Sequence, residues 1–287
     1  MGNEVTSVSY IGKPASSSAM YITKKVEHLL CNLEQAQGCL VFCENTIEVP
    51  PELAGRHEFL MTANPQLDYI SYVTKIADKL EAANRKRKYT LAVGGYYIGE
   101  NVTLGKDCFI EPTCLIGHDV VIGDHAHIRA GAVIKNAVIG DNFIANEHCA
   151  VGMNGFNFAR NESGETVRIP SLGKVVIGNN VEVGALSNVS VGTAGNTVIH
   201  DYVKIDCLVH VSHDVTLGEK AELCAGAITG GFDSIGDGVF IGGNAVFKNR
   251  VAVGDSSFVA MGSVVTKGLE PGSDVFGNPA RAFKRDK

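Results

Sequence analysis

The sequence lacks several features that would point to common protein classes. It contains no tryptophan, and its eight cysteines include no C-x-x-C pair and no spacing typical of a disulfide framework. No apolar run is long enough to span a membrane, and no secretory signal is evident. The net charge of −6 and the pI of about 5.8 argue against a general nucleic-acid-binding protein. We therefore expect a cytoplasmic protein with reduced thiols, no nucleic-acid partner and no stable membrane insertion.

The chain does contain a long six-residue repeat. Between residues 199 and 270 every sixth position is mostly aliphatic, and the fifth position of each hexad is mostly small or β-branched. Residues 98–134 show the same period. Each hexad can bury two side chains on a short strand, but such strands cover their apolar edges only by stacking. The repeated first positions are Ile199, Ile205, Val211, Leu217, Leu223, Thr229, Ile235, Ile241, Phe247, Val253, Val259 and Val265.

Residues 1–90 follow a different pattern, which predicts a small α/β domain. The expected elements are a strand at 5–11, a helix at 23–37, strands at 39–43 and 58–61, and a helix that begins at Asn64-Pro65. Residues 91–287 then form the repeat domain, which carries a non-repeat insertion loop at 152–174 and a short C-terminal tail. Loops on a rigid scaffold often carry function.

The hexads resemble those of the hexapeptide-repeat acyltransferases. The resemblance implies a left-handed parallel β-helix in which three hexads form one triangular coil, so that residues eighteen apart lie one above the other. The expected fold is therefore mainly β, a left-handed parallel β-helix with a small N-terminal α/β domain. The family also implies a homotrimer whose active sites lie between neighbouring prisms.

His213 is the most informative of the nine histidines. It occupies the third position of its hexad, on a corner that we expect to point out of the prism. Gly231 would lie one coil above it, beside Gly230, in the least regular hexad of the run. Asp233 in that hexad stands where other hexads have a small buried residue, and local rules fail most often at functional sites.

This arrangement suits the transfer of an acyl group from a thioester to an amine. A neutral imidazole, with an ordinary pKa of about 6.5, can accept the proton that the amine loses. A glycine N–H can stabilise the developing oxyanion. No serine or cysteine nucleophile beside a base is evident, so we expect direct attack by the amine. Two aspartates are close enough in sequence to orient the ring, and the candidate catalytic residues are His213, Asp206, Asp214 and Gly231.

The stretch 152–214 is similar to the UDP-3-O-acylglucosamine N-acyltransferases of lipid A (lipopolysaccharide) synthesis. The matching segments are Gly155-Phe156-x-Phe158, Arg168-Ile169-Pro170, Gly173-x-Val-Val-Ile-Gly178 and Ile205-Asp206 through His213-Asp214. This resemblance implies that His213 is the general base, supported by Asp206, and that the N-terminal domain holds a uridine. The candidate substrate-binding residues are Tyr21, Asn154, Phe156, Phe158 and Arg168.

The C-terminal part departs from that family. The lipid A enzyme has a helical extension that engages acyl carrier protein, whereas the ending Gly277-Asn-Pro-Ala-Arg281 is typical of coenzyme-A-dependent sugar acetyltransferases. At the position where that family has a second histidine, this chain has Arg250. Cationic side chains on the later coils could bind the coenzyme phosphates. The candidate coenzyme-binding residues are Gly230, Lys248, Arg250, Lys267 and Arg281.

The sequence therefore favours an N-acyltransferase that moves an acyl group from acyl-CoA (acetyl-CoA or hydroxyacyl-CoA) to the amino group of a nucleotide-linked amino sugar, without a metal. The first alternative is the lipid A pathway enzyme, with acyl carrier protein as donor. An alternative of another class is a metal-dependent solenoid of the γ-type carbonic anhydrases, which needs three histidines that converge on a metal between subunits. The sugar, the amine position and the acyl length stay open.

Overall fold

The computed structural model describes residue 5 and residues 7–283, and the chain forms two compact units. The N-terminal unit holds the residues up to Lys86 together with Phe156–Gly173 and Thr193–Gly195. The second unit holds Arg87–Gly155, Lys174–Gly192 and the residues from Asn196 onward. The insertion that the sequence analysis grouped with the repeat domain is thus divided, and most of it belongs to the N-terminal unit.

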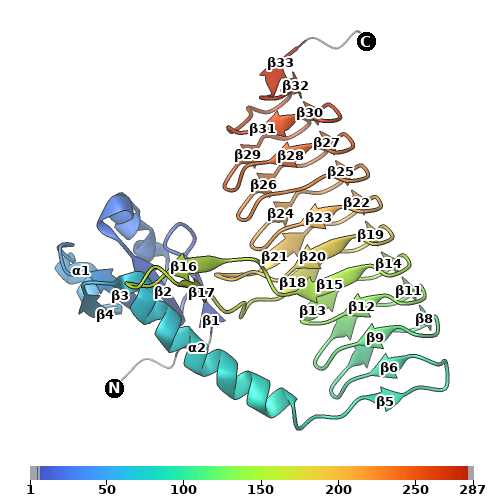
Figure 1. The fold of residues 1–287 in the computed structure, drawn as a ribbon, viewed down its shortest axis with the longest axis horizontal. Coiled ribbons are helices and arrows are strands. Elements are labelled where there is room, and N and C mark those ends of the chain that lie inside the picture. Colours follow the sequence, from blue (N-terminus) through green and yellow to red (C-terminus); the bar gives the residue numbers. More distant parts are fainter. Residues whose placement is uncertain (1–4, 6, 284–287) are drawn as a thin grey trace. The chain divides into compact units, whose positions relative to one another are not determined.

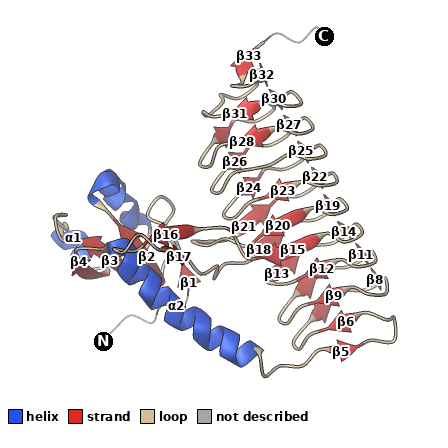
Figure 2. Ribbon diagram, in the orientation of Figure 1, coloured by secondary structure: helices blue, strands red, loops and turns tan. Residues whose placement is uncertain are grey.

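The N-terminal unit contains a parallel four-stranded sheet, which the helical segments flank (Figure 2). In sheet order the strands are β1 (Ser7–Val8), β2 (Ser18–Ile22), β3 (Leu40–Glu44) and β4 (Glu58–Thr62). The helical segments are η1 (Lys24–Gln35), α1 (Pro51–Ala54) and α2 (Pro65–Asn84). The expected start of α2 at Asn64-Pro65 is confirmed, whereas η1 is a 3₁₀ segment with a kink at Val26. None of the helices in the described ranges is long and apolar enough to cross a membrane.

The two faces of this sheet bury different apolar clusters, as alternation along a strand requires. Met20 and Val41 pack with η1 residues such as Leu33 on one face. Ala19 and Phe42 point to the other face, where they join Tyr69 and Ile70 of α2. Two strands of the insertion, β16 (Phe158–Arg160) and β17 (Thr166–Arg168), form an antiparallel hairpin. The insertion contributes Ala159 and Ile169 to the second cluster, which explains why it belongs to this unit.

The second unit is a solenoid of stacked coils, which Figure 1 shows from green to red. Its short strands form three sheets of mainly parallel strands. The first sheet contains β5 (Thr90–Leu91), β6 (Tyr97–Ile98), β9 (Leu115–Ile116), β12 (Val133–Ile134), β15 (Ala150–Met153), β20 (Asn188–Ser190) and β23 (His210–Val211). A bridge at Ile228 continues this sheet to β28 (Val246–Phe247) and β31 (Val264–Val265).

The other two sheets form the remaining sides of each coil. The second sheet contains β7 (Thr103–Leu104), β10 (Val121–Ile122), β13 (Ala137–Ile139), β18 (Val175–Ile177), β21 (Thr197–Ile199), β24 (Thr216–Leu217), β26 (Ser234–Ile235) and β29 (Ala252–Val253). The third contains β8 (Phe109–Ile110), β11 (His127–Ile128), β14 (Ile144–Ala145), β19 (Glu182–Val183), β22 (Lys204–Ile205), β25 (Glu222–Leu223), β27 (Phe240–Ile241), β30 (Phe258–Val259), β32 (Asp274–Phe276) and β33 (Arg281–Ala282).

The hexad pattern produces the expected core and register. Every first-position residue from Ile199 to Val265 is buried, and so are the fifth-position residues between them. Thr216 pairs with Ser234 in the next coil, which confirms the expected stacking of residues eighteen apart. The fourth residue of most hexads turns the corner with a positive φ, for example 59° at Asp214 and 64° at Phe232. These corners place the third and fourth residues of successive coils in columns along the solenoid.

Candidate active site

The candidate site is built from three successive corners of the solenoid, each of which follows a strand position of the first sheet. Ser212–Asp214 follow β23, Gly230–Phe232 lie on the next coil after the bridge at Ile228, and Lys248–Arg250 follow β28. We call these three segments the His213 corner. Backbone hydrogen bonds join them, because Phe232 N donates to His213 O and Arg250 N donates to Gly231 O, both at 3.0 Å.

His213 lies under the neighbouring coil rather than in open solvent. Its Nδ1 is 2.8 Å from Oδ2 of Asp214, and the side chain of Phe232 meets the imidazole edge-on with ring centroids 5.3 Å apart. A Cβ placed on Gly231 would be 2.6 Å from both Cε1 and Nε2 of the ring, so only glycine fits directly above His213. The residue is 7% exposed. The sequence predicts an outward corner beneath Gly231, and the structure adds that the coil above covers the ring.

The aspartate that contacts His213 is Asp214 and not Asp206. Asp206 follows β22 on a different corner, where its Oδ1 accepts the N–H of Cys207 and its Oδ2 accepts the N–H of Ala225. These bonds give Asp206 a structural role within its own corner. The preference for Asp206, which came from the family resemblance, is corrected by this geometry.

The two glycines above His213 differ in what their amides do. The N–H of Gly230 donates to Asp233 Oδ2 at 2.7 Å. The N–H of Gly231 has no acceptor among the residues that the structure describes, which leaves it available to a ligand oxygen. Gly231 thus keeps the property expected of an oxyanion donor, whereas Gly230 serves the turn.

Sequence reasoning missed two buried hydroxyl groups that support this corner. Thr229 Oγ1 accepts the N–H of Ser212, and Thr197 Oγ1 accepts the N–H of Asp214, both at 3.0 Å. Both threonines are buried, and their hydroxyls take the place of backbone carbonyls that regular corners use. The available signal was Thr229 itself, which is polar at a hexad position that is otherwise apolar.

Further polar groups lie next to the same corner. His210 Nδ1 is 2.7 Å from Oδ1 of Asn188 on the outer face of the first sheet. Burial, with a smaller contribution from His213, lowers the pKa of His210 below its usual value. His210 is therefore neutral at physiological pH, and donation of Nδ1–H to Asn188 leaves the lone pair on Nε2.

The expected coenzyme-binding cations divide into two groups. Lys248, Arg250 and Lys267 are exposed, and the register of β28 with β31 puts Lys267 one coil beyond Asn249, at the same edge as His213. The Arg250 guanidinium lies 4.2 Å from the centroid of the Phe232 ring. Arg281 belongs instead to β33 of the third sheet, so the structure does not bring it to this corner.

The expected substrate-binding residues are spread over both units. Asn154 is exposed. It directly follows β15, which puts it at the same edge of the first sheet as His213. In the N-terminal unit, Phe156 is 82% exposed and contacts Phe158, and the Arg168 guanidinium lies 4.4 Å from the Phe158 ring centroid. Tyr21 accepts a hydrogen bond from Gln66, and its ring lies against Tyr69, 5.3 Å between centroids. The packing of Tyr21 fits a core residue, and its base-stacking role remains a prediction.

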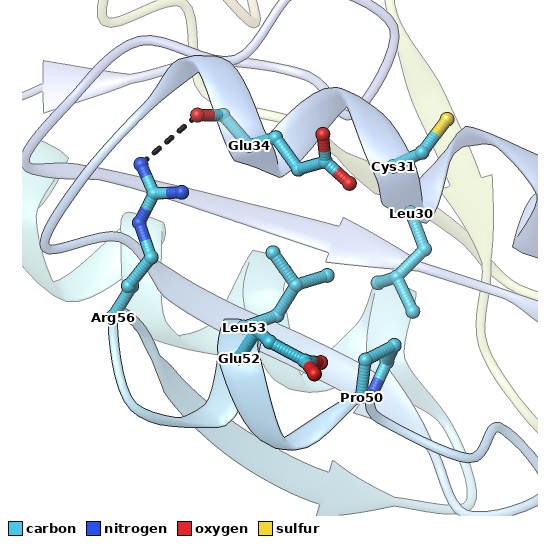
Figure 3. Close-up of a pocket in the computed structure, with 7 residues that line it drawn as sticks. All are labelled: Leu30, Cys31, Glu34, Pro50, Glu52, Leu53 and Arg56. Carbon is cyan, nitrogen blue, oxygen red and sulfur yellow. Dashed lines mark hydrogen bonds between the residues drawn. The ribbon is translucent and has the colours of Figure 1, made fainter.

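The N-terminal unit also has an open pocket of about 480 Å³ between η1 and α1 (Figure 3). Arg56 donates to the backbone carbonyl of Glu34 at its edge. The lining residues are Leu30, Cys31, Glu34, Pro50, Glu52, Leu53 and Arg56, none of which the sequence analysis selected. Within the described ranges, no group of three or more His, Cys, Asp or Glu side chains is arranged to hold a metal ion.

Comparisons with known proteins agree with this fold. The family model of the bacterial transferase hexapeptide (six repeats) matches residues 101–136, and the hexapeptide repeat of succinyl-transferase matches residues 234–267. The solved structure of Francisella novicida UDP-N-acetylglucosamine acyltransferase aligns with a TM-score of 0.57 at 25% identity, covering 62% of this chain and 64% of that one.

Curated relatives give a more specific likeness. The chain is 31% identical over 155 residues to the UDP-3-O-acylglucosamine N-acyltransferase of Methylorubrum extorquens, covering 54% of this chain and 44% of that protein. It is 36% identical over 147 residues to a probable mitochondrial UDP-3-O-acylglucosamine N-acyltransferase of Arabidopsis thaliana, covering 51% and 48%. The chain thus spans about half the length of these relatives.

The repeats and the stacked coils define a hexapeptide-repeat protein that folds as a left-handed parallel β-helix. Within that class, the chain resembles the UDP-3-O-acylglucosamine N-acyltransferases.

Proposed function

We propose that the protein is an N-acyltransferase that joins an acyl group from a thioester to the amine of a UDP-linked amino sugar. The observation that carries the proposal is the His213 corner, where an imidazole held by Asp214 lies directly beneath Gly231, a residue whose amide has no acceptor among the described residues. A base and an oxyanion donor on adjacent coils are what attack by an amine on a thioester carbonyl requires.

The contacts assign a role to each group. If the Nδ1–H of His213 donates to Asp214 Oδ2, the lone pair stays on Nε2, which faces Gly231 and can take the amine proton. The carboxylate of Asp214 then stabilises the imidazolium that forms. The Gly231 N–H would meet the thioester oxygen as it becomes negative. When the tetrahedral intermediate collapses, the C–S bond breaks, the thiolate leaves and the amide product remains.

The choice of acceptor follows the alternative of the sequence analysis rather than its first reading. The relatives that match here are named for N-acylation of a UDP-3-O-acylglucosamine, which is more specific than a general nucleotide-linked amino sugar. The amine would approach from the side of Asn154, which lies at the same edge of the first sheet. We therefore propose UDP-3-O-acylglucosamine as the acceptor to test first.

The cationic side chains near His213 suggest the chemistry of the acyl donor. Lys248, Arg250 and Lys267 are exposed at the His213 edge, and such cations suit the phosphate of a phosphopantetheine arm. Acyl-CoA and acyl carrier protein share that arm, so the chemistry is common to the first reading and its alternative. Arg281 lies on another sheet and has no place in this donor site.

Zinc analysis of the purified protein tests the metal-dependent alternative, whose three histidines would converge between neighbouring chains. The homotrimer stays a prediction. Light scattering at working concentration tests it, and a monomer would remove the expectation that neighbouring chains share the site.

The deciding experiment measures amide formation from UDP-3-O-acylglucosamine with two donors, hydroxyacyl-CoA and hydroxyacyl carrier protein. Thiol release and mass spectrometry of the product report turnover. UDP-N-acetylglucosamine, whose amine is already acylated, is the control acceptor and should give no product. Turnover with either carrier supports the proposal and identifies the donor. Equal thiol release with the control acceptor, or no amide with either donor, would contradict it.

A further inference from the structure

Asp233 interrupts the regular hydrogen bonding of the solenoid at the level of His213. In regular corners the amide of the second hexad residue donates to a carbonyl of the next coil, as Gly218 N does to Ile235 O at 2.8 Å and Lys248 N to Val265 O at 2.9 Å. At the coil above His213 the equivalent amide, Gly230 N, donates to Asp233 Oδ2 instead. A side chain has replaced the backbone acceptor here, as the Thr229 hydroxyl does for Ser212 N on the coil below.

The same carboxylate also reaches the following coil. Its second oxygen, Oδ1, accepts the N–H of Val251 at 2.8 Å. Asp233 is 1% exposed and occupies a fifth hexad position, where neighbouring hexads bury Ala227, Val239 and Ala245. A carboxylate inside a hydrophobic solenoid is costly unless it is hydrogen-bonded, and both oxygens of Asp233 have backbone donors. This side chain therefore ties two successive coils together from within.

The segment that Asp233 ties down is the one that covers the base. Gly230 and Gly231 are consecutive glycines, which restrict the backbone less than any other pair of residues. Outside the prism, Phe232 packs against the imidazole of His213, and the Arg250 guanidinium packs against the Phe232 ring. Inside the prism, only Asp233 fixes the Gly230 amide. The direction of the Gly231 N–H thus depends on contacts from both sides.

We propose that Asp233 is a positioning residue that holds the Gly231 N–H over His213 in the orientation that receives the thioester oxygen. This inference rests on the acyl transfer proposed above. It makes Asp233 a specific part of the acyl-transfer machinery that does not touch substrate. Preorganised donors are effective because they need no reorientation as charge develops.

The protonation state of Asp233 should matter for the same reason. Burial raises the pKa of Asp233 to about 7, although the backbone N–H groups oppose this shift. A protonated carboxyl loses one acceptor site, so one of the two amides would lose its partner. The titratable or charged groups on the flanking segments are His210 and His213 on the coil below and Arg250 on the coil above. The tie should therefore be intact on the alkaline side and weakened on the acid side.

The test compares Asp233→Asn with wild type and with the matched control Ser257→Ala. Asn keeps one acceptor, removes the second and does not titrate. Ser257 is also a buried polar residue at a fifth hexad position, and its hydroxyl likewise bonds both its own corner, at Gly254 O, and the next coil, at Ser273 N. We expect Asp233→Asn to lower kcat about 10- to 100-fold with KM nearly unchanged, as for misoriented catalytic groups. The control should keep wild-type kcat.

The pH profile separates positioning from a general loss of structure. In wild type, protonation of Asp233 weakens the tie, so log kcat should fall more steeply on the acid side in wild type than in Asp233→Asn. Wild-type kcat in the variant, or an unchanged slope, would overturn the inference while the proposed function stands.

A second measurement needs no turnover. In protein labelled with ¹⁵N-glycine, the Gly230 and Gly231 amide signals should shift as Asp233 is protonated, and this part of the shift should be absent from Asp233→Asn. Identical shifts in wild type and variant would overturn the inference. If no donor and acceptor pair reacts, the proposed function fails, and this titration alone decides whether Asp233 controls the corner.

Discussion

The substitution Gly231→Ala tests the geometry of the candidate site most directly. The new Cβ would lie 2.6 Å from Cε1 and Nε2 of His213, whereas carbon atoms in contact are about 3.5 Å apart or more. The ring or the corner must therefore move by about 1 Å. Gly231 does not need a positive φ, so the backbone tolerates alanine and the collision with the ring is the main effect.

Both activity and stability should respond. A displacement of about 1 Å at a catalytic group can lower the turnover number by about 100-fold. Overpacking of a filled site costs about 1–3 kcal/mol of the free energy of unfolding. Steady-state kinetics and chemical denaturation at one protein concentration measure the two effects. The matched control is Gly243→Ala, which also changes a third hexad position but meets only the Ala225 carbonyl, at 3.2 Å.

A double-mutant cycle identifies the cause of the stability loss. If the imidazole is the obstacle, Gly231→Ala should cost little in a His213→Ala background, and the coupling free energy should be about 1–3 kcal/mol. Equal costs in both backgrounds would mean that the ring does not lie beneath Gly231. Wild-type turnover and stability in Gly231→Ala alone would refute the whole arrangement of base and oxyanion donor.

Four further substitutions separate the roles of the neighbouring residues. His213→Ala should lower kcat by about 10²–10⁴ with KM little changed, and denaturation should also show a loss of stability because the ring is buried. Asp214→Asn should lower kcat strongly, whereas Asp206→Asn should leave kcat near wild type, and the reverse order would restore Asp206 as the supporting residue. Thr229→Val leaves the Ser212 N–H without its acceptor and should cost about 1–3 kcal/mol in unfolding free energy; no loss would show that water replaces the hydroxyl.

The repeat allowed much of the fold to be predicted because its physical cause is local. The apolar pattern of each hexad determines which two side chains are buried in the solenoid. The coils then stack because the strand edges must be covered. The cysteines at fifth positions illustrate this, since the pattern predicts their burial: Cys114 and Cys149 are buried, whereas Cys108, near the start of the solenoid, is only partly buried. The coil length of eighteen residues also predicts that Gly231 lies above His213, and the structure confirms this position.

Other features depend on contacts that a repeat does not encode. Ala159 and Ile169 belong to a core made with Tyr69, far away in sequence, so the insertion joins the N-terminal unit. The burial of His213 depends on Phe232, whose role only the stacked corner reveals. The Asp214–His213 contact depends on the side-chain arrangement at this corner, because the positive φ of Asp214 is shared by the fourth residue of most hexads.

The buried carboxyl of Asp233 should also make the stability of the protein depend on pH in a predictable direction. Burial raises its pKa from 3.8 to about 7 in the folded state. Its contribution to the free energy of unfolding is therefore complete below pH 3.8 and is lost as the pH rises through about 7. The shift corresponds to a loss of up to about 4 kcal/mol.

Chemical denaturation at about pH 5 and pH 8 measures this loss, and Asp233→Asn isolates it because an amide does not titrate. We expect wild type to lose more stability than the variant between these two values, at equal protein concentration. Equal losses would contradict the buried, titrating carboxyl. The ionised carboxylate of Asp233 lowers the free energy of unfolding, but it is also the form that accepts the N–H groups of Gly230 and Val251. The contact that orders the His213 corner would therefore reduce the stability of the protein.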